Sequence, residues 1–243
     1  MQNTEFRTGV IRPVECFKEG WELIKAQYWL LFAVSLVGML IGGATMYILL
    51  GAMVCGIFYC YLQKIDGKTF QFEDLFKGFN YILPGLVVVL FIVVPMIVVY
   101  AGIYFPVLAA ILMGSKLSES DFMALLTGSL IVDFIFIVVM VCLHTLLMFA
   151  FPLIVDRNLS GWQAMKTSAR AVWNNLGGVA GLWAVGFAVN LVGLMIFCIG
   201  VYLTIPILIA GNIVAYRKVF PRQNEPVFNP PTPDAYRGAG SYT

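Results

Sequence analysis

Between Tyr28 and Gln63 the chain reads YWLLFAVSLVGMLIGGATMYILLGAMVCGIFYCYLQ, a run of 36 residues without one charged side chain. Three similar runs follow at 80–115, 122–155 and 176–216, with a single acidic residue in the second of these. A helix of about 20 apolar residues is long enough to cross a bilayer. Runs of this length and composition therefore predict membrane-spanning helices.

The overall composition also places the chain among membrane proteins. Of its 243 residues, 60% are hydrophobic and 12% are charged, whereas a soluble domain carries about 25% charged residues. The net charge of +2 is too small to predict nucleic-acid binding. The first apolar run exceeds the h-region of about 7–15 residues in a cleavable signal peptide, so we expect the first span to act as an uncleaved anchor.

The positions of the basic residues predict the orientation of the spans. Fourteen of the fifteen Lys and Arg residues lie in the stretches 1–27, 64–80, 156–176 and 217–243, and the other is Lys116. Short loops rich in Lys and Arg stay on the cytoplasmic side of a membrane. Six spans place 14 basic residues inside and one outside, whereas four spans would place nine inside and six outside. Six spans with both termini in the cytoplasm are therefore predicted.

The first and last runs are each long enough for two helices joined by a tight turn, near Gly42-Gly43-Ala44 and near Cys198-Ile199-Gly200. We expect spans at about 28–43, 46–63, 83–106, 126–151, 178–198 and 201–216. Prolines shape the third span. Pro84 suits its first turn, Pro95 predicts a kink, and Pro106 predicts a bend or an end.

Each cytoplasmic stretch before an odd-numbered span has apolar residues at helical spacing. These residues are Val14, Phe17, Trp21 and Ile24, then Phe72, Leu75, Phe76 and Phe79, and then Trp162, Met165, Ala169, Val172 and Trp173. Charged or polar residues stand between them, which is typical of amphipathic helices in the plane of the membrane interface. Ser160 and Gln163 also fit a capping box at the start of the third helix.

The predicted fold is thus all-α, a polytopic membrane helical bundle of six transmembrane helices with three cytoplasmic interfacial amphipathic helices. The order of amphipathic helix, span and span repeats three times, from near Pro13, Phe70 and Leu159. We expect an integral membrane domain over 1–220. The remaining stretch, 221–243, is rich in proline and predicts an extended cytoplasmic tail that can bind partners.

Several segments carry a resemblance to a known family. GKTFQFEDLFKGF at 67–79 resembles a loop of bacterial six-helix inner-membrane proteins, and the further similar segments are FPLIVD at 151–156, AMKTS at 164–168, Asn174-Asn175, LTIP at 203–206 and AYR at 215–217. The family includes YciC-like proteins and the membrane domain that some glycerophosphodiester phosphodiesterases carry beside their catalytic domain. The resemblance covers roughly 13–220 and implies a six-helix fold in the bacterial inner (cytoplasmic) membrane. It implies no catalytic residues, and nothing after residue 220 resembles the catalytic domain.

Three polar residues inside the predicted spans form a candidate intramembrane polar site. Asp133 is the only carboxylate within a span, where charges are costly and often functional, although it also lies near the outer end of its helix. His144 shares a face with Asp133 about 16 Å along the axis, so a proton relay would need bridging groups such as Asn190 and Thr204. The alternative for His144 is a hydrogen-bonded core residue.

Other chemistry is not predicted. A single histidine, five cysteines and the absence of CxxC or HExxH predict neither a disulfide framework nor a metal site, and we expect no cofactor and no enzymatic activity. Glycines inside the spans predict close helix packing within the bundle, or oligomerisation. The candidate packing residues are Gly38, Gly42, Gly186, Gly193 and Gly200.

Two functions follow as expectations. The first is a non-catalytic scaffold or accessory subunit that binds a protein partner in a membrane assembly and is surrounded by membrane lipids. The alternative is a transporter or lipid-handling protein that uses the polar site at Asp133, His144 and Asn190. An intramembrane enzyme is the least favoured, because few reactive side chains meet at depth.

Overall fold

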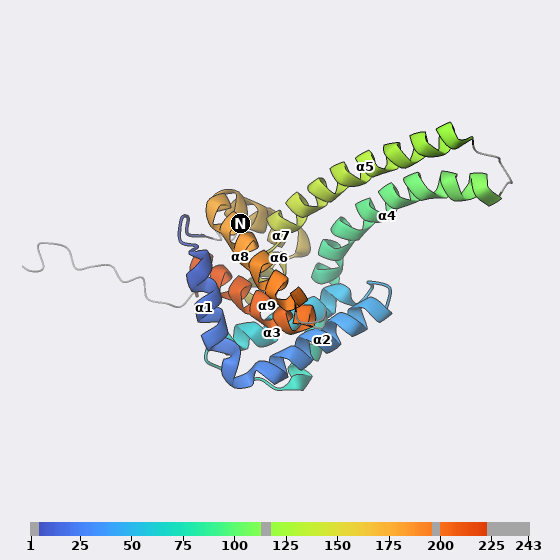
Figure 1. The fold of residues 1–243 in the computed structure, drawn as a ribbon. Coiled ribbons are helices and arrows are strands. Elements are labelled where there is room, and N and C mark those ends of the chain that lie inside the picture. Colours follow the sequence, from blue (N-terminus) through green and yellow to red (C-terminus); the bar gives the residue numbers. More distant parts are fainter. Residues whose placement is uncertain (1–4, 113–117, 196–199, 223–243) are drawn as a thin grey trace, which may run out of the picture.

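The computed structural model describes residues 5–112, 118–195 and 200–222, and these residues form helices and connecting turns without strands. Figure 1 shows the helices in chain order. They are α1 (Pro13–Ile24), α2 (Tyr28–Ala44), α3 (Leu50–Ile65), α4 (Ile82–Leu112), α5 (Glu119–Leu146), α6 (Ala150–Arg157), α7 (Gly161–Trp173), α8 (Leu176–Met195) and α9 (Gly200–Val219), with the 3-10 helices η1 (Lys25–Gln27) and η2 (Phe72–Tyr81).

Five stretches of helix are long and apolar enough to cross a membrane. They are Pro13–Ala44, Phe72–Gly102, Met123–Arg157, Leu176–Met195 and Gly200–Val219. A sixth apolar helix, α3, is shorter at 16 residues. The chain therefore has the helices of a multi-pass membrane protein, and the count of six spans stays a prediction.

The turn within the first apolar run lies slightly later than expected. α2 ends at Ala44 and α3 begins at Leu50, so the chain reverses just after the predicted glycines. Met46 and Tyr47 occupy the left-handed region there, with φ of 48° and 68°, which non-glycine residues rarely adopt. The corresponding turn of the last run, at 198–200, lies largely outside the described residues.

The prolines of the third predicted span bend its helix without ending it. α4 contains Pro84 in its first turn as expected, and it continues past Pro106 to its end at Leu112. Figure 1 shows that α4 curves along its length. A proline removes one backbone hydrogen bond and pushes the helix away from the ring, so a bend without an end is an ordinary result.

The fourth predicted span is broken into α5 and α6. Pro152, near the start of α6, has no N–H to donate to the carbonyl of Met148, so the helix cannot run through this point unperturbed. The break also leaves the Phe149 N–H and the Leu146 carbonyl without helical partners, and the hydroxyl of Ser168 in α7 satisfies both. It accepts from the Phe149 N–H at 3.1 Å and donates to the carbonyl of Leu146 at 2.6 Å.

The three predicted amphipathic segments are all helical. They form α1, η2 and α7, and η2 is a 3-10 helix. Half of the predicted capping box is present, because Ser160 Oγ accepts from the Gln163 N–H at 3.4 Å. At the start of η2 the other contact of a capping box is present, because the Asp74 carboxylate accepts from the Gln71 N–H at 2.9 Å.

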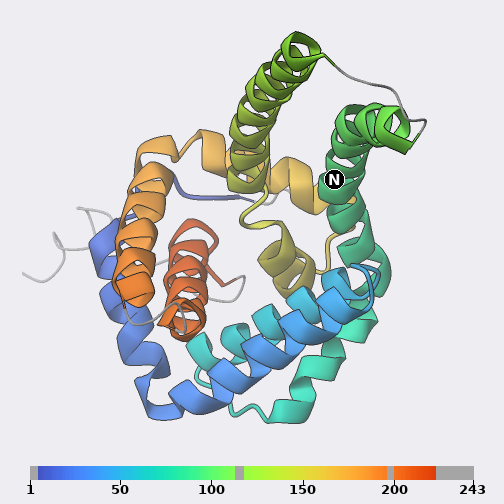
Figure 2. The same cartoon turned by 45° about the vertical axis from the view of Figure 1, so that its right-hand side comes forward.

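The helices form three units arranged in a ring. The units are α1–α2–α3, η2–α4–α5–α6 and α7–α8–α9, and Figure 2 shows α3, α6 and α9 on the inside of the ring. Each amphipathic helix packs against the inner helix of the preceding unit. η2 packs on α3, α7 packs on α6, and α1 packs on α9, which closes the ring.

Small residues allow these contacts. A Cβ added to Gly20 of α1 would lie 2.9 Å from the backbone nitrogen of Gly211 in α9. A Cβ on Gly78 of η2 would lie 2.6 Å from the backbone nitrogen of Gly56 in α3. Such contacts leave no room for a larger residue, so each pair of backbones touches directly.

α1 packs along the length of another helix of the ring. α1 runs antiparallel along α9, since the Arg7 N–H donates to the Val219 carbonyl at one end and the Tyr28 hydroxyl donates to the Leu203 carbonyl at the other. The face formed by Cys16, Gly20 and Ile24 is buried against the ring. The position of α1 relative to the membrane stays a prediction.

Candidate functional site

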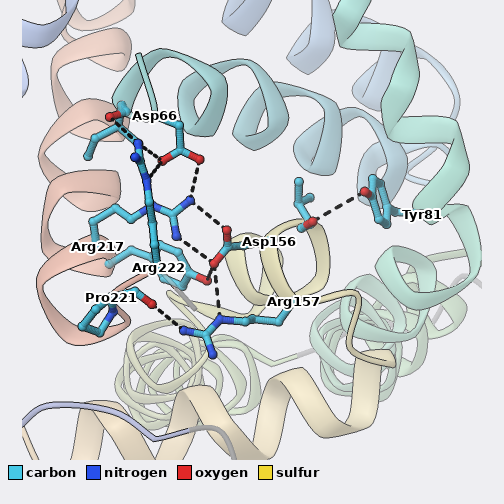
Figure 3. Close-up of polar contacts among 10 residues, drawn as sticks. Asp66, Tyr81, Asp156, Arg157, Arg217, Pro221 and Arg222 are labelled. Atoms are coloured by element: carbon cyan, nitrogen blue, oxygen red, sulfur yellow. Dashed lines mark hydrogen bonds and ion pairs between the residues drawn. The ribbon is translucent and has the colours of Figure 1, made fainter. Parts of the chain in front are cut away.

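The C-terminal ends of the three inner helices meet, and they bring together Asp66, Asp156 and Arg217 (Figure 3). Arg217 donates from Nη1 and Nη2 to the two oxygens of Asp156, both at 2.8 Å. The same Nη2 donates to Asp66 Oδ2 at 3.0 Å. Bidentate pairing of this kind fixes the geometry as well as the charge. One guanidinium of α9 thus holds the carboxylates that follow α3 and end α6.

Asp156 has further partners. The Tyr216 hydroxyl donates to its Oδ2 at 2.7 Å, and Arg157 Nε lies 3.5 Å from the same oxygen. Arg157 also donates from Nη2 to the carbonyl of Pro221 at 2.7 Å. The segment that follows α9 is therefore tied to the end of α6.

Asp66 has a second partner in Arg222, which donates from Nε to Asp66 Oδ1 at 2.9 Å. All four carboxylate oxygens of the two aspartates thus accept at least one hydrogen bond. The side chains of Arg217 and Asp156 are only 11% and 16% exposed, so solvent screens this pair weakly. We name Asp66, Asp156, Arg157, Arg217 and Arg222 the helix-end cluster. Because its carboxylates are fully engaged, it acts as a clamp between helices.

Sequence reasoning missed the helix-end cluster. Its members are 61 and 151 residues apart along the chain, so no local spacing shows that they meet. A weak signal was present, because the last helix of every unit has a charged residue in its last turn or directly after it. Asp156 and Arg217 also lie within segments that carry the family resemblance.

Asp133 lies in α5, which forms a hairpin with α4 that extends away from the ring in Figures 1 and 2. The Tyr104 hydroxyl donates to Asp133 Oδ2 at 3.2 Å. Near this pair the rings of Tyr100 and Phe136 meet edge to face, with centroids 5.9 Å apart. Asp133 therefore joins the two arms of the hairpin.

The other two predicted polar residues have separate partners. His144 is exposed, and its Nδ1 lies 2.8 Å from the carbonyl of Met140 in its own helix. Asn190 of α8 accepts from the Thr204 hydroxyl of α9 at 2.8 Å. No hydrogen bond joins any two of Asp133, His144 and Asn190 in the described part of the chain. Their combination into one site stays a prediction.

Asn190 does line a cavity of about 240 Å³ between α1, α8 and α9. Asn212 of α9 contributes a second amide, and Phe17, Trp183 and Phe187 supply aromatic walls. The Oδ1 atom of Asn212 is enclosed and has no hydrogen-bond partner among the described residues. The cavity thus combines two amide side chains with apolar walls.

The five predicted packing glycines lie at contacts between consecutive helices. A Cβ on Gly38 would lie 2.9 Å from Ile57 Cδ1, and one on Gly42 would lie 2.7 Å from Leu50 Cδ1. In the third unit, a Cβ on Gly193 would lie 2.9 Å from the carbonyl oxygen of Gly200, and Gly186 faces Leu208 and Phe17. These contacts are all within the chain.

Titratable groups of other kinds are scattered. The described residues contain no group of three or more His, Cys, Asp or Glu side chains that could hold a metal ion. Cys16, Cys55 and Cys60 are buried free thiols, and Cys142 is exposed.

Comparisons of the chain with protein-family models, with curated proteins and with solved structures found no match.

Proposed function

We propose that the protein is a six-span, non-catalytic membrane protein of the bacterial inner membrane that serves as a scaffold or accessory subunit of a larger assembly. The observation that carries this proposal is the hairpin of α4 and α5, which leaves the ring and touches little of the described chain beyond its base (Figure 1). We expect a transmembrane helix of a partner protein to pack on this hairpin.

The hairpin helices are long and apolar. α4 has 31 residues and α5 has 28, which is about 46 Å and about 42 Å at 1.5 Å per residue, against a hydrocarbon core of about 30 Å. Large apolar side chains are exposed along both helices, including Val94, Ile97, Val98 and Phe105 of α4 and Leu130, Ile131, Phe134 and Ile135 of α5. Lipid tails alone would cover such a surface, so a further feature is needed to favour a protein partner.

Gly102 and Gly128 supply that feature. A Cβ at either position would meet nothing within 4 Å, so neither glycine is needed for packing within the described chain. A glycine inside a helix costs about 1 kcal/mol relative to alanine. Small residues on membrane helices let a second helix approach closely. These two positions therefore favour a helix of another chain as the occupant.

A photoreactive side chain placed at Val98 or Phe134 tests the proposal directly. These residues are 64% and 68% exposed, and Phe187 of α8 is a matched control at 65%. We expect a discrete protein adduct from the two hairpin positions in native membranes, and none from Phe187. Equal adducts from all three positions, or a pure monomer that retains full cellular function, would contradict the proposal.

Gly102→Leu gives an independent test. The new side chain has free space within the chain, so the protein should fold and insert normally, and the hairpin adduct should be lost. Gly177→Leu is the control, because Gly177 of α8 also faces open space but lies outside the hairpin. Retention of the adduct in Gly102→Leu would argue against helix docking at this glycine.

A second candidate function is transport or lipid handling, and the cavity at Asn190 and Asn212 favours it. Polar groups facing a cavity between membrane helices are typical of substrate paths. Asn212→Leu, which removes one of the two amides that line the cavity, should then abolish function at normal expression. Asp133→Asn should do the same if Asp133 belongs to the path. Unchanged phenotypes in both variants would exclude this function.

A further inference from the structure

A second cavity lies beside the helix-end cluster and has a different chemical character. It has a volume of about 410 Å³ and is lined by residues of the N-terminal segment, α1, the end of α3 and the end of α9. Its lining combines charged and apolar side chains, which are Arg7, Glu19, Arg217 and Lys218 on the one hand and Leu23, Ile65, Val214 and Pro221 on the other. We name it the basic cavity.

The backbone at Arg7 is held firmly at the edge of this cavity. The Arg7 N–H donates to the Val219 carbonyl at 2.8 Å, and the Arg7 carbonyl accepts from Asn175 Nδ2 at 3.2 Å. The neighbouring Phe6 ring packs against Phe220, with centroids 6.2 Å apart. The guanidinium of Arg7, in contrast, lies within 4 Å of no carboxylate in the described part of the chain.

The charges around the basic cavity do not cancel. Lys218 pairs with Glu19 at 2.8 Å, and the helix-end cluster sets three arginines against two aspartates. With Arg7, these eight side chains sum to five positive and three negative charges, a surplus of two. A cavity with this surplus of positive charge attracts an anion.

The location of the basic cavity indicates which class of anion it binds. It lies where two apolar helices, α3 and α9, end, so its cations stand at the edge of the apolar part of the molecule. Its volume is in the range of about 300–1,000 Å³ that small-molecule sites occupy. Basic residues at the ends of membrane helices attract the phosphate of anionic lipids.

We propose that the basic cavity binds a phosphate ester, with Arg7 and Lys218 as the residues that contact the phosphate oxygens and the apolar lining in contact with the organic group. The same chemistry is offered by a phospholipid headgroup and by a soluble phosphate compound. This site is independent of the hairpin and of the partner proposed above.

The test uses the full chain in nanodiscs of phosphatidylcholine alone or of an equimolar mixture with phosphatidic acid. Thermal unfolding and lipid retention by native mass spectrometry report binding. We expect the mixture to raise the unfolding temperature and to leave phosphatidic acid bound. Arg7→Gln and Lys218→Gln should each weaken retention about fivefold, since one basic residue near a lipid phosphate contributes on the order of 1 kcal/mol.

Three control variants distinguish lipid binding at the basic cavity from lipid attraction by surface charge in general. Arg12→Gln and Lys25→Gln remove cations of α1 or its flanks that lie outside the cavity, and both should retain the lipid as the unchanged protein does. Glu19→Gln removes the same ion pair as Lys218→Gln but leaves the cation in place, so it should bind at least as tightly. Equal losses in all five variants, or no difference between the two nanodisc compositions, would overturn the proposal.

A second arm identifies the source of the phosphate. Inorganic phosphate and glycerol 3-phosphate are added to the protein in phosphatidylcholine nanodiscs. Stabilisation by these compounds that is lost in Arg7→Gln assigns a soluble ligand. Stabilisation by phosphatidic acid alone assigns a lipid headgroup.

Discussion

Arg217 connects the ends of the three inner helices at the scale of a single residue. It donates to Asp156 and Asp66. Asp156 also forms an ion pair with Arg157, and Asp66 forms one with Arg222. A charged group that loses its partner while it stays shielded from water retains the full cost of desolvation. The helix-end cluster is consequently sensitive to the removal of one member.

Arg217→Met should destabilise the protein by about 3 kcal/mol, the lower part of the range for breaking a buried ion pair, because Arg157 and Arg222 remain near the aspartates. Thermal or denaturant unfolding in detergent measures this loss. Arg12→Met is the control. Its pair with Glu15 is exposed, at 75% and 49%, and is worth at most about 1 kcal/mol. Similar losses in the two variants would show that the cluster is not a clamp.

Ser168 performs a comparable task for the backbone. Its hydroxyl satisfies an N–H and a carbonyl at the break between α5 and α6. Ser168→Ala should cost about 1–3 kcal/mol, because the Phe149 N–H is left buried without a partner. Ser129→Ala removes an exposed hydroxyl that bonds only within its own helix and should change stability little. An unfolding experiment in which both variants match the unchanged protein would refute this role.

At the scale of elements, the ring depends on backbones in direct contact. A Cβ on Gly56 of α3 would lie 1.9 Å from the carbonyl oxygen of Leu75 in η2, which no rotamer change can relieve. Gly20 and Gly211 make a similar contact between α1 and α9. Each contact joins one unit to the next, so the glycines determine how the units follow each other.

Gly56→Ala should therefore separate η2 from α3 and lower stability by about 1–3 kcal/mol or more, the usual cost of overpacking. Gly102→Ala, with open space around its Cβ, should be neutral or raise stability by up to about 1 kcal/mol through helix propensity. The two unfolding temperatures in the same detergent provide the comparison. A neutral Gly56→Ala would mean that η2 does not pack on α3 as described.

The elements themselves could be foreseen in large part. Apolar spacing located α1, η2 and α7 to within two residues of the expected starts at Pro13, Phe70 and Leu159. The break before α6 was not foreseen, although Pro152 indicates it, because a proline in a long apolar run is often tolerated with a bend alone. Periodicity shows which face of a helix is apolar, but it does not show which other helix covers that face. The packing of α1 on α9 was missed for this reason.

At the scale of the whole molecule, the three units are related in arrangement as well as in order. Each contributes an outer amphipathic helix and an inner helix, and the inner helices end together at the helix-end cluster (Figures 2 and 3). If the inner helices cross a membrane, helix ends that meet in one cluster lie on the same side of it. We expect that side to face the cytoplasm under the positive-inside rule, because Lys64, Arg157, Arg217, Lys218 and Arg222 lie at or next to these ends.

Cysteine labelling in intact cells tests this central claim most directly. Lys68→Cys marks the loop after α3, Arg170→Cys marks the last turn of α7, and Ser120→Cys marks the start of α5. All three variants have Cys142 and Cys198 replaced by alanine. The account predicts that a membrane-impermeant reagent labels Ser120→Cys in intact cells and labels the other two only after the membrane is opened. Labelling of Lys68→Cys or Arg170→Cys from outside intact cells would contradict it.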